Sequence, residues 1–287
     1  MLTREEFDIL SRLAQDNDQC VMNTECAKKL IIVGYIDNDG KVTESGLAAL
    51  EPYRVQRACF LAAGFGQRLN PVTINTPKPM VNVNGKRIIE TLLDAVIAAG
   101  IQEIYIAVGY LEEQFELLKS KYPMITLLHN TSYRTTNNIS SALLFGERIR
   151  NSYIIESDLF LSNPRLIRRY QYESNYLGIP MKHTDDYCIF AKDGYIDRVG
   201  IGGDNCYQIV GITYWTDTDG ARLAKQIEKV FSLPEGKQLF FGSVATRYYL
   251  SDYKIGVREC AQEDVVEIDS FSELQKIDQR YMIPGNV

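Results

Sequence analysis

The sequence predicts an α/β fold in which a mostly parallel sheet is flanked by helices, with a small helical module at the N-terminus. Two patterns support this prediction. From residue 57 onward, short apolar runs alternate with helix-like runs, which is the rhythm of βαβ units. Residues 1–54 instead read as helices followed by a hairpin. We therefore expect two domains, residues 1–54 and residues 55–287.

The N-terminal segment predicts a winged-helix-like module. Its expected elements are a helix over Glu5–Gln15, a helix from Thr24 to Val33 with Thr24 as N-cap, a hairpin over residues 34–43 with an Asp-Gly turn, and a short helix over Glu44–Leu50. The residues Gly-Tyr-Ile-Asp at 34–37 and Thr-Glu-Ser-Gly-Leu at 43–47 resemble the winged-helix segment of MarR-type regulators.

Two features of residues 1–54 argue against DNA binding. Only one clear helix fits between the first helix and the hairpin, so a full helix-turn-helix is not expected. The segment also carries six Lys and Arg against ten Asp and Glu, and DNA binding needs basic contacts to phosphates. An interaction or packing module is therefore favoured over a nucleotide-sensing DNA-binding regulator.

The larger domain is expected to alternate strands and helices. Its predicted strands are Arg57–Leu61, Glu103–Val108, Ile125–His129, Tyr153–Ser157, Cys188–Lys192, Tyr195–Val199 and Gln208–Trp215. Its predicted helices are Arg87–Ala99, Leu111–Tyr122, Ile139–Ile149, Pro164–Ser174 with Asn163 as N-cap, Asp219–Phe231 and Phe271–Ile283.

A small-residue turn after the first of these strands predicts a phosphate-binding loop. Ala62, Ala63, Gly64 and Gly66 let backbone N–H groups approach phosphate oxygens. Arg68 offers a planar fork to phosphate, and Lys78 lies on an extended Pro-Lys-Pro segment. A Walker loop is excluded because Gly85-Lys86 is followed by Arg87, and a dinucleotide fingerprint is excluded because position 69 is Leu.

Carboxylates at two strand ends predict a metal site. Asp158 ends an apolar strand on the side of the Gly64 loop, and Glu267 and Asp269 share one face of a second strand. Mg²⁺ prefers a few carboxylates together with phosphates and water. The alternative is that Asp158 ends a strand and Asp269 caps the last helix.

A polar segment follows residue 130 and leads into a helix. Its amides and hydroxyls, among them Asn137, Asn138 and Ser141, could read the edge of a base.

The motifs together resemble the bacterial CTP:phosphocholine cytidylyltransferases and, more broadly, the sugar-nucleotide nucleotidyltransferases. The matching stretches are Leu61–Arg68, Pro77–Pro79, Val108–Leu111, Asn137–Ser141, Glu156–Asp158 and Glu267–Ser270. The resemblance implies a Rossmann-like nucleotidyltransferase fold in which Arg68 and Lys78 bind the triphosphate. It further implies that the residue 62–66 loop, Tyr110 and residues 137–141 surround the cytidine, and that Asp158, Glu267 and Asp269 hold Mg²⁺.

The resemblance is weaker at the acceptor site, which in the family is an aromatic cage with nearby carboxylates, suited to a quaternary ammonium. Asp185, Asp186 and Tyr187 stand at the matching place, and Trp215 lies in a matching strand. A family Trp-Asp pair corresponds here to Phe241-Gly242, so one acid is missing. The alternative for Tyr187 and Trp215 is core packing.

The expected activity is therefore Mg²⁺-dependent transfer of CMP from CTP to a small phosphorylated amine similar to phosphocholine, with release of pyrophosphate. A sugar-1-phosphate or aminoalkylphosphonate acceptor is the alternative. A net charge of −6 disfavours a nucleic-acid surface. No signal-peptide pattern or membrane span is apparent, and six cysteines form no Cys-x-x-Cys pair. We expect a cytoplasmic enzyme, and a homodimer is a possible assembly.

Overall fold

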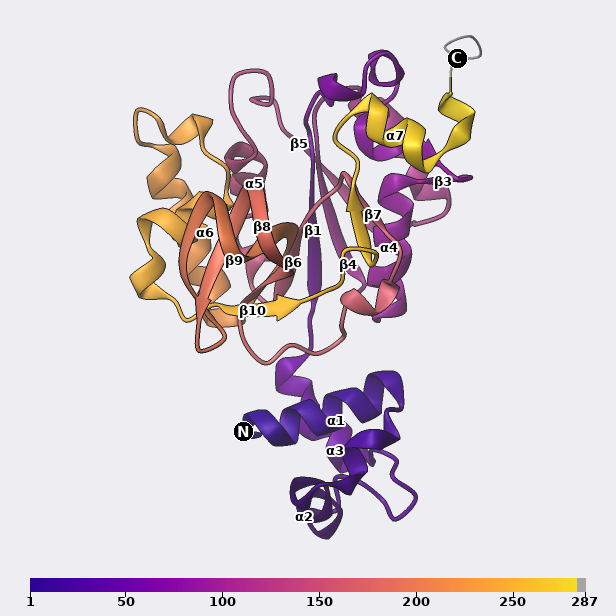
Figure 1. The fold of residues 1–287 in the computed structure, drawn as a ribbon, viewed down its shortest axis with the longest axis vertical. Coiled ribbons are helices and arrows are strands. Elements are labelled where there is room, and N and C mark those ends of the chain that lie inside the picture. The colour runs from indigo at the N-terminus through magenta and orange to yellow at the C-terminus, as the bar shows by residue number, and fades with distance from the viewer. Residues whose placement is uncertain (283–287) are drawn as a thin grey trace. The chain divides into compact units, whose positions relative to one another are not determined.

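The computed structural model describes residues 1–282, and the predicted end of the last helix at Ile283 lies outside that range. The chain forms two compact units. One comprises Met1–Val55 together with Arg168–Tyr172, and the other comprises Gln56–Ile167 together with the described residues from Glu173 onward. Figure 1 shows both units.

The smaller unit is built from three helices around an apolar core. The helices are α1 (Arg4–Asp16), α2 (Glu25–Val33) and α3 (Glu44–Leu50). Thr24 accepts a hydrogen bond from the backbone of Ala27, so it caps α2 as predicted. The apolar side chains of Phe7, Leu10 and Leu30 are buried in its core.

The predicted hairpin of this unit is only partly formed. A single antiparallel bridge joins Ile36 to Val42, and a short 3₁₀ helix that the sequence did not indicate spans Gln19–Asn23. The helix caps and the turn agree with the sequence, but the winged-helix interpretation stays a prediction.

The larger unit contains a seven-stranded sheet in the order β10-β8-β9-β6-β1-β4-β5. The strands are β1 (Arg57–Ala62), β4 (Glu103–Val108), β5 (Ile125–His129), β6 (Ser152–Glu156), β8 (Asn175–Lys192), β9 (Tyr195–Trp215) and β10 (Gly256–Glu259). Two small pairs accompany it, β2 (Asn82–Val83) with β3 (Lys86–Arg87), and β7 (Leu159–Leu161) with β11 (Val265–Glu267).

Helices cover both faces of this sheet. They are α4 (Ile88–Ala98), α5 (Ile139–Phe145) and α6 (Asp217–Phe231), while α7 (Phe271–Ile277) packs through Leu274 on the apolar cluster of Leu69, Val81 and Ile88. In Figure 1, α5 and α6 lie on one side of the central strands and α4 lies on the other. Strand β1 is apolar on both faces and is parallel to both β4 and β6, as expected for a strand buried between two helical layers. The predicted Rossmann-like, mostly parallel architecture is confirmed.

Several predicted elements differ in length. The predicted helix over Pro164–Ser174 is wrong: a 3₁₀ turn ends at Leu166, and Arg168–Tyr172 instead belongs to the smaller unit, where Tyr170 bridges to Arg54. The predicted helix at 111–122 is a 3₁₀ helix over Glu112–Ser120.

The three short strands predicted after residue 187 are two long strands, β8 and β9, joined by a turn at Asp193-Gly194 where both residues have positive φ. This tight turn lets the two strands continue pairing far beyond the runs of apolar residues that the sequence pattern marks.

All six cysteines carry free thiols. Within residues 1–282, no helix combines the length and apolarity that crossing a lipid bilayer requires.

Candidate active site

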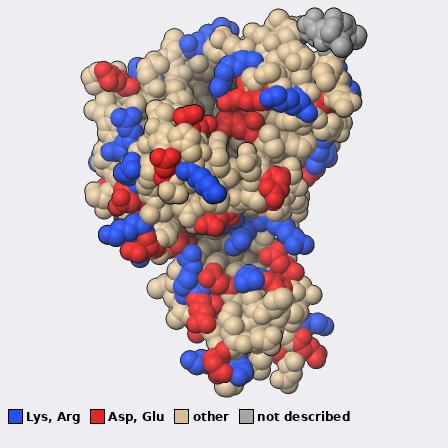
Figure 2. Space-filling model, in the orientation of Figure 1, with Lys and Arg blue, Asp and Glu red and all other residues tan. Residues whose placement is uncertain are grey.

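A pocket of about 540 Å³ opens where β1 and β6 end at the carboxyl edge of the sheet, the usual place for ligands in such folds. Its lining brings together the loop after β1, Lys78, the polar residue 136–141 segment, the end of β6, and residues beyond β11. Figure 2 shows a hollow in the larger unit with acidic and basic side chains beside it. The pocket therefore unites most of the motifs singled out in the sequence.

The glycines of the loop after β1 have different structural roles. Gly66 has a φ of +63°, and a Cβ placed there would lie 2.8 Å from the Cβ of Lys78. A side chain at position 66 would be strained and would also displace Lys78. A Cβ at Gly64 would meet no atom within 4 Å, so the backbone there is open to the pocket.

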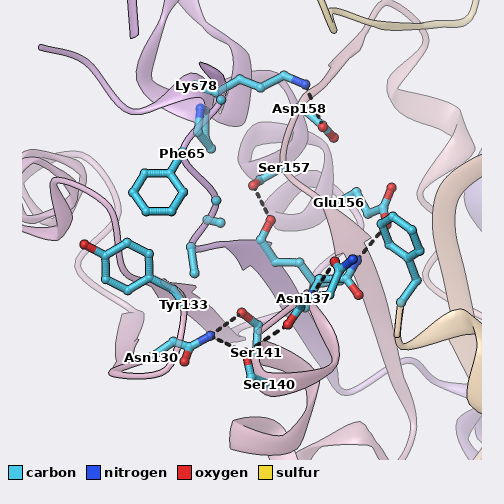
Figure 3. A pocket seen from close by; sticks show the side chains of 18 of the residues that line it. Phe65, Lys78, Asn130, Tyr133, Asn137, Ser140, Ser141, Glu156, Ser157 and Asp158 are labelled. Atoms are coloured by element: carbon cyan, nitrogen blue, oxygen red, sulfur yellow. Dashed lines mark hydrogen bonds and ion pairs between the residues drawn. The ribbon is translucent and has the colours of Figure 1, made fainter. Parts of the chain in front are cut away.

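Lys78 lies between two carboxylates. Its Nζ donates to Asp158 Oδ2 at 2.8 Å and to Asp269 Oδ1 at 2.7 Å, although the residue is only 8% exposed. Burial alone would lower the pKa of Lys78, but the two carboxylates outweigh it and raise that pKa. Lys78 is thus a fixed positive charge inside the pocket, as Figure 3 shows.

Arg68 stands at the mouth of the same cluster. Its Nη2 lies 2.9 Å from Asp269 Oδ2, and its side chain is 72% exposed. An exposed guanidinium can leave such a partner at little cost, so Arg68 is free to turn toward an anion that enters the pocket.

Asp158, Glu267 and Asp269 come together as predicted, with ligand oxygens within 4.8 Å of one another. The β7–β11 pair places Glu267 opposite Leu159, the neighbour of Asp158 in the chain. Glu267 lines the pocket. Desolvation of its carboxylate by the surrounding protein, and then the charge of Asp158, raise the pKa of Glu267 to about 8.

These residues fit a divalent cation. Oδ1 of Asp158 is buried and has no hydrogen-bond partner among the described residues. The pocket lining holds the four carboxyl groups of Glu156, Asp158, Glu267 and Asp269 beside Arg68 and Lys78. A polyanion needs additional positive charge to bind there, and hard oxygen ligands are those that Mg²⁺ takes.

Glu156 is a pocket carboxylate that the sequence analysis did not assign. Its Oε1 accepts a hydrogen bond from Asn138 Nδ2 at 3.2 Å. Burial, and then the nearby charge of Asp158, raise the pKa of Glu156 to about 8. The signal in the sequence was its spacing of two from Asp158, the same spacing that separates Glu267 from Asp269.

Aromatic rings line another part of the pocket. Phe65 and Tyr133 have ring centroids 5.2 Å apart, and both are part of the lining. Tyr110 lies behind them, 5.3 Å from Phe65, with its hydroxyl donating to the carbonyls of Thr73 and Ile74. Tyr110 therefore supports Phe65 and is not itself part of the pocket surface. Phe65 belongs to the residue 62–66 loop that was expected around the cytidine, whereas Tyr133 was not predicted.

The polar segment lines the pocket, but many of its groups are already paired. Asn130 Nδ2 donates to the hydroxyls of Ser140 and Ser141 at 2.8 and 2.9 Å. Asn137 Nδ2 donates to the carbonyl of Gln238, and Asn138 Oδ1 accepts from the backbone of Phe241. Asn137 and Asn138 therefore hold the loop at 237–241 in place.

The predicted acceptor residues do not converge in the pocket. Trp215 is fully buried, donates to Thr213 Oγ1 at 3.0 Å and packs against the rings of Tyr176 and Tyr253. The sequence placed Trp215 correctly at the end of a strand but not on which face, and that face belongs to the core. Trp215 therefore offers no free ring to an acceptor.

The acidic pair at 185–186 lies on the outside of the β8–β9 hairpin. The Asp185 side chain is 98% exposed and pairs with His183, and Asp186 is not part of the pocket lining. Tyr187 approaches the pocket indirectly, with its ring 5.9 Å from that of Phe240, which does line it. The register of β8 against β9 shifts between Thr184 and Tyr187, so the two acids lie in an irregular stretch of the hairpin.

Comparison with known proteins agrees with this geometry. The nucleotidyl transferase family is matched over residues 57–161. The 2-aminoethylphosphonate cytidylyltransferase of Lancefieldella rimae is 34% identical over 229 residues, which cover 78% of this chain and 93% of that protein. The choline-phosphate cytidylyltransferase of Streptococcus pneumoniae is 29% identical over 225 residues, covering 78% and 97%.

A solved structure shows the same fold. The CTP:phosphocholine cytidylyltransferase from Streptococcus pneumoniae superposes with a TM-score of 0.72 at 30% identity, covering 79% of this chain and 99% of that one. A sequence match this extensive, joined to the same fold and to the acidic and basic cluster at the sheet edge, identifies the family. The chain belongs to the nucleotidyltransferases, in the group that includes the bacterial 2-aminoethylphosphonate and choline-phosphate cytidylyltransferases.

Proposed function

We propose that this enzyme transfers CMP from CTP to a small phosphorylated or phosphonylated amine in the presence of Mg²⁺ and releases pyrophosphate. The observation that carries the proposal is the position of Lys78, which lies within hydrogen-bond distance of Asp158 and Asp269 beside the open loop at Gly64. The named relatives, two cytidylyltransferases with phosphonate and phosphate acceptors, support the nucleotide and the acceptor class.

The pocket offers separate places for the parts of the nucleotide. Phe65 and Tyr133 present ring faces suited to stacking a cytosine, and the loop at Gly64 and Gly66 presents backbone N–H groups to phosphates. Arg68 and Lys78 supply the positive charge that the triphosphate meets at the metal end of the pocket.

The reaction needs no protein nucleophile. An oxygen of the acceptor's phosphate or phosphonate attacks the α-phosphorus, a new P–O bond forms, and the bond to the β-phosphate oxygen breaks. Lys78 and Arg68 stabilise the negative charge that builds on the phosphate oxygens. Because Lys78 is held by two carboxylates, its position is fixed before the substrates arrive, which lowers the entropic cost of reaching the transition state.

Asp158, Glu267 and Asp269 would hold Mg²⁺, which supplies further positive charge to the triphosphate when bound. Asp158 and Asp269 also keep Lys78 protonated through their negative charge. Asn137 and Asn138 bind the loop at 237–241 and so fix the wall of the pocket that carries Phe240. Residues 1–54 have no role in this proposal.

A pyrophosphate-release assay tests the proposal. Each of the four nucleoside triphosphates is paired with phosphocholine, phosphoethanolamine, 2-aminoethylphosphonate and glucose 1-phosphate, with Mg²⁺ present. We expect CTP with an amine acceptor to give the highest kcat/KM. A preference for glucose 1-phosphate would support the sugar-phosphate alternative and contradict the amine acceptor, and release with no acceptor dependence would contradict transfer altogether.

A further inference from the structure

The carboxylate of Glu156 occupies the opposite part of the pocket from the aromatic rings. In Figure 3, Glu156 lies on one side of the pocket, and Phe65 and Tyr133 lie on the other. It is not one of the three carboxylates that gather as a metal cluster. The proposed function places the base against Phe65 and Tyr133 and the triphosphate beside Lys78. The part of the pocket that remains for the acceptor is the part beside Glu156.

Glycine on the neighbouring strand makes room for this carboxylate. A Cβ at Gly211 on β9 would lie 2.5 Å from Glu156 Oε2, so any larger residue would displace the carboxylate. Asn138 Nδ2 holds the other oxygen, Oε1, at 3.2 Å. Among residues 1–282, Oε2 has no donor assigned to it and is left to accept from a ligand.

A second polar group without a partner lies near Glu156. Tyr176 is 3% exposed, and its hydroxyl has no hydrogen-bond partner among the described residues. Burial and the charge of Glu156 raise the pKa of this phenol, so it stays neutral. A Cβ at Gly242 would lie 3.4 Å from the hydroxyl oxygen, and Tyr176 is not part of the pocket lining, so the phenol belongs to the buried surroundings of Glu156.

We propose that Glu156 forms the subsite for the acceptor's amine, and that this subsite selects a primary ammonium over a quaternary one. The inference rests on the proposed function, since it names which amines that reaction uses. Glu156 would accept a charge-assisted hydrogen bond from the ammonium through Oε2.

The chemistry of the two kinds of amine supports this choice. A primary ammonium has three N–H donors, whereas a quaternary ammonium has none and depends on aromatic faces. Here the Trp that could have enlarged a cage, Trp215, is buried in the core, and the ring that lines the pocket on this wall is Phe240, with Tyr187 5.9 Å behind it. A trimethylated amine would leave the carboxylate oxygen of Glu156 unpaired, which a site built on hydrogen bonds penalises.

The experiment compares matched acceptors on the full-length enzyme. The first pair is 2-aminoethylphosphonate against its N,N,N-trimethyl derivative, the second is phosphoethanolamine against phosphocholine, and ethylphosphonate is the acceptor without an amine. We expect the primary amine to have at least about tenfold higher kcat/KM in both pairs.

Variants assign the preference to residues. Glu156→Gln keeps an oxygen for Asn138 but removes the charge, and it should reduce the preference for primary amines at least about tenfold while changing ethylphosphonate little. The matched control is Glu103→Gln, which changes a surface Glu paired with Arg57 at the other end of the sheet. It should change neither the preference for primary amines nor the use of ethylphosphonate.

The outcomes separate this inference from the proposed function. Equal or better use of the trimethylated acceptors by the wild-type enzyme would overturn the inference and leave the proposed function standing. An equal loss for ethylphosphonate and the amines in Glu156→Gln would also overturn it, because Glu156 would then act on something other than the amine. If no amine acceptor supports pyrophosphate release, both fail.

Discussion

Lys78 and Asp269 are separated by 191 positions in the chain, yet the Nζ of one lies 2.7 Å from the Oδ1 of the other. The contact joins the Pro-Lys-Pro segment after the phosphate loop to the residues that follow β11, and Asp158 at the end of β6 completes it. Three distant segments thereby place one cation and its counter-charges at the edge of the sheet where the nucleotide is expected.

Replacing Lys78 by Ala should lower kcat at least about a hundredfold, since a preorganised cation on the transferring phosphate contributes about 3 kcal/mol. The chain should still fold, because the Asp158 and Asp269 side chains reach solvent in part. Steady-state kinetics and a thermal melt measure both effects. Lys86→Ala, which removes a half-exposed lysine paired with Asp94, is the control. Near wild-type turnover in a folded Lys78→Ala enzyme would contradict the assignment of Lys78.

The substitutions Asp158→Asn and Asp269→Asn should each raise the Mg²⁺ concentration needed for half-maximal activity, because each removes one negative charge from the proposed metal site. Titration of activity with Mg²⁺ at saturating CTP gives that concentration. Asp217→Asn, in a surface pair with Arg150, should leave the titration unchanged. The metal site is wrong if both pocket variants titrate as the wild type does.

Two glycine substitutions should differ in kind. Gly66→Ala forces a side chain into a positive φ and against Lys78, so it should lower the free energy of unfolding by about 1–2 kcal/mol and also reduce kcat. In Gly64→Ala the new Cβ meets no atom within 4 Å, so the free energy of unfolding should stay unchanged and only the KM for CTP should rise. Denaturant unfolding and kinetics on both variants provide the comparison, and equal stability of the two would refute the structural role of Gly66.

The position of Trp215 gives a prediction that opposes an acceptor role. Trp215→Phe removes the hydrogen bond to Thr213 and leaves a cavity among the rings of Tyr176 and Tyr253, at a cost of about 2 kcal/mol in unfolding free energy. The acceptor KM should change little. A large rise in acceptor KM with an unchanged free energy of unfolding would contradict this prediction and indicate that Trp215 contacts the acceptor.

The N-terminal unit should give the chain no appreciable affinity for duplex DNA at physiological salt. Ten acidic residues against six basic ones in residues 1–54 oppose the counterion release that drives such binding. A gel shift of the full-length protein at micromolar concentration, repeated at two salt concentrations, tests this. A shift that weakens with salt would revive the DNA-binding interpretation.

The sequence predicted the sheet and its site where local signals were strong. β4 and β5 match their predicted bounds, because apolar β-branched runs between breakers mark buried strands. The place of Asp158 in the cluster with Glu267 and Asp269 could be predicted because Asp158 follows a strand at the carboxyl edge of the sheet. The antiparallel pairing of β11 with β7, which brings Glu267 to this edge, could not.

What the sequence could not give depends on contacts between distant residues. Nothing local indicates that residues 168–172 leave the larger unit or that Trp215 faces the core. In the same way, the amides of Asn137 and Asn138 look available in sequence, but the loop at 237–241 takes up their hydrogen bonds. Glu156 was overlooked because its environment is set by Gly211, far along the chain.

The most direct test of the account is identification of the product. The enzyme is incubated with CTP, Mg²⁺ and 2-aminoethylphosphonate, and ³¹P NMR and mass spectrometry follow the phosphorus-containing species. The account predicts one CMP-linked aminoalkylphosphonate for each pyrophosphate released, with both signals lost in Lys78→Ala. Pyrophosphate without a CMP-linked product, or no product with any amine acceptor, would contradict it.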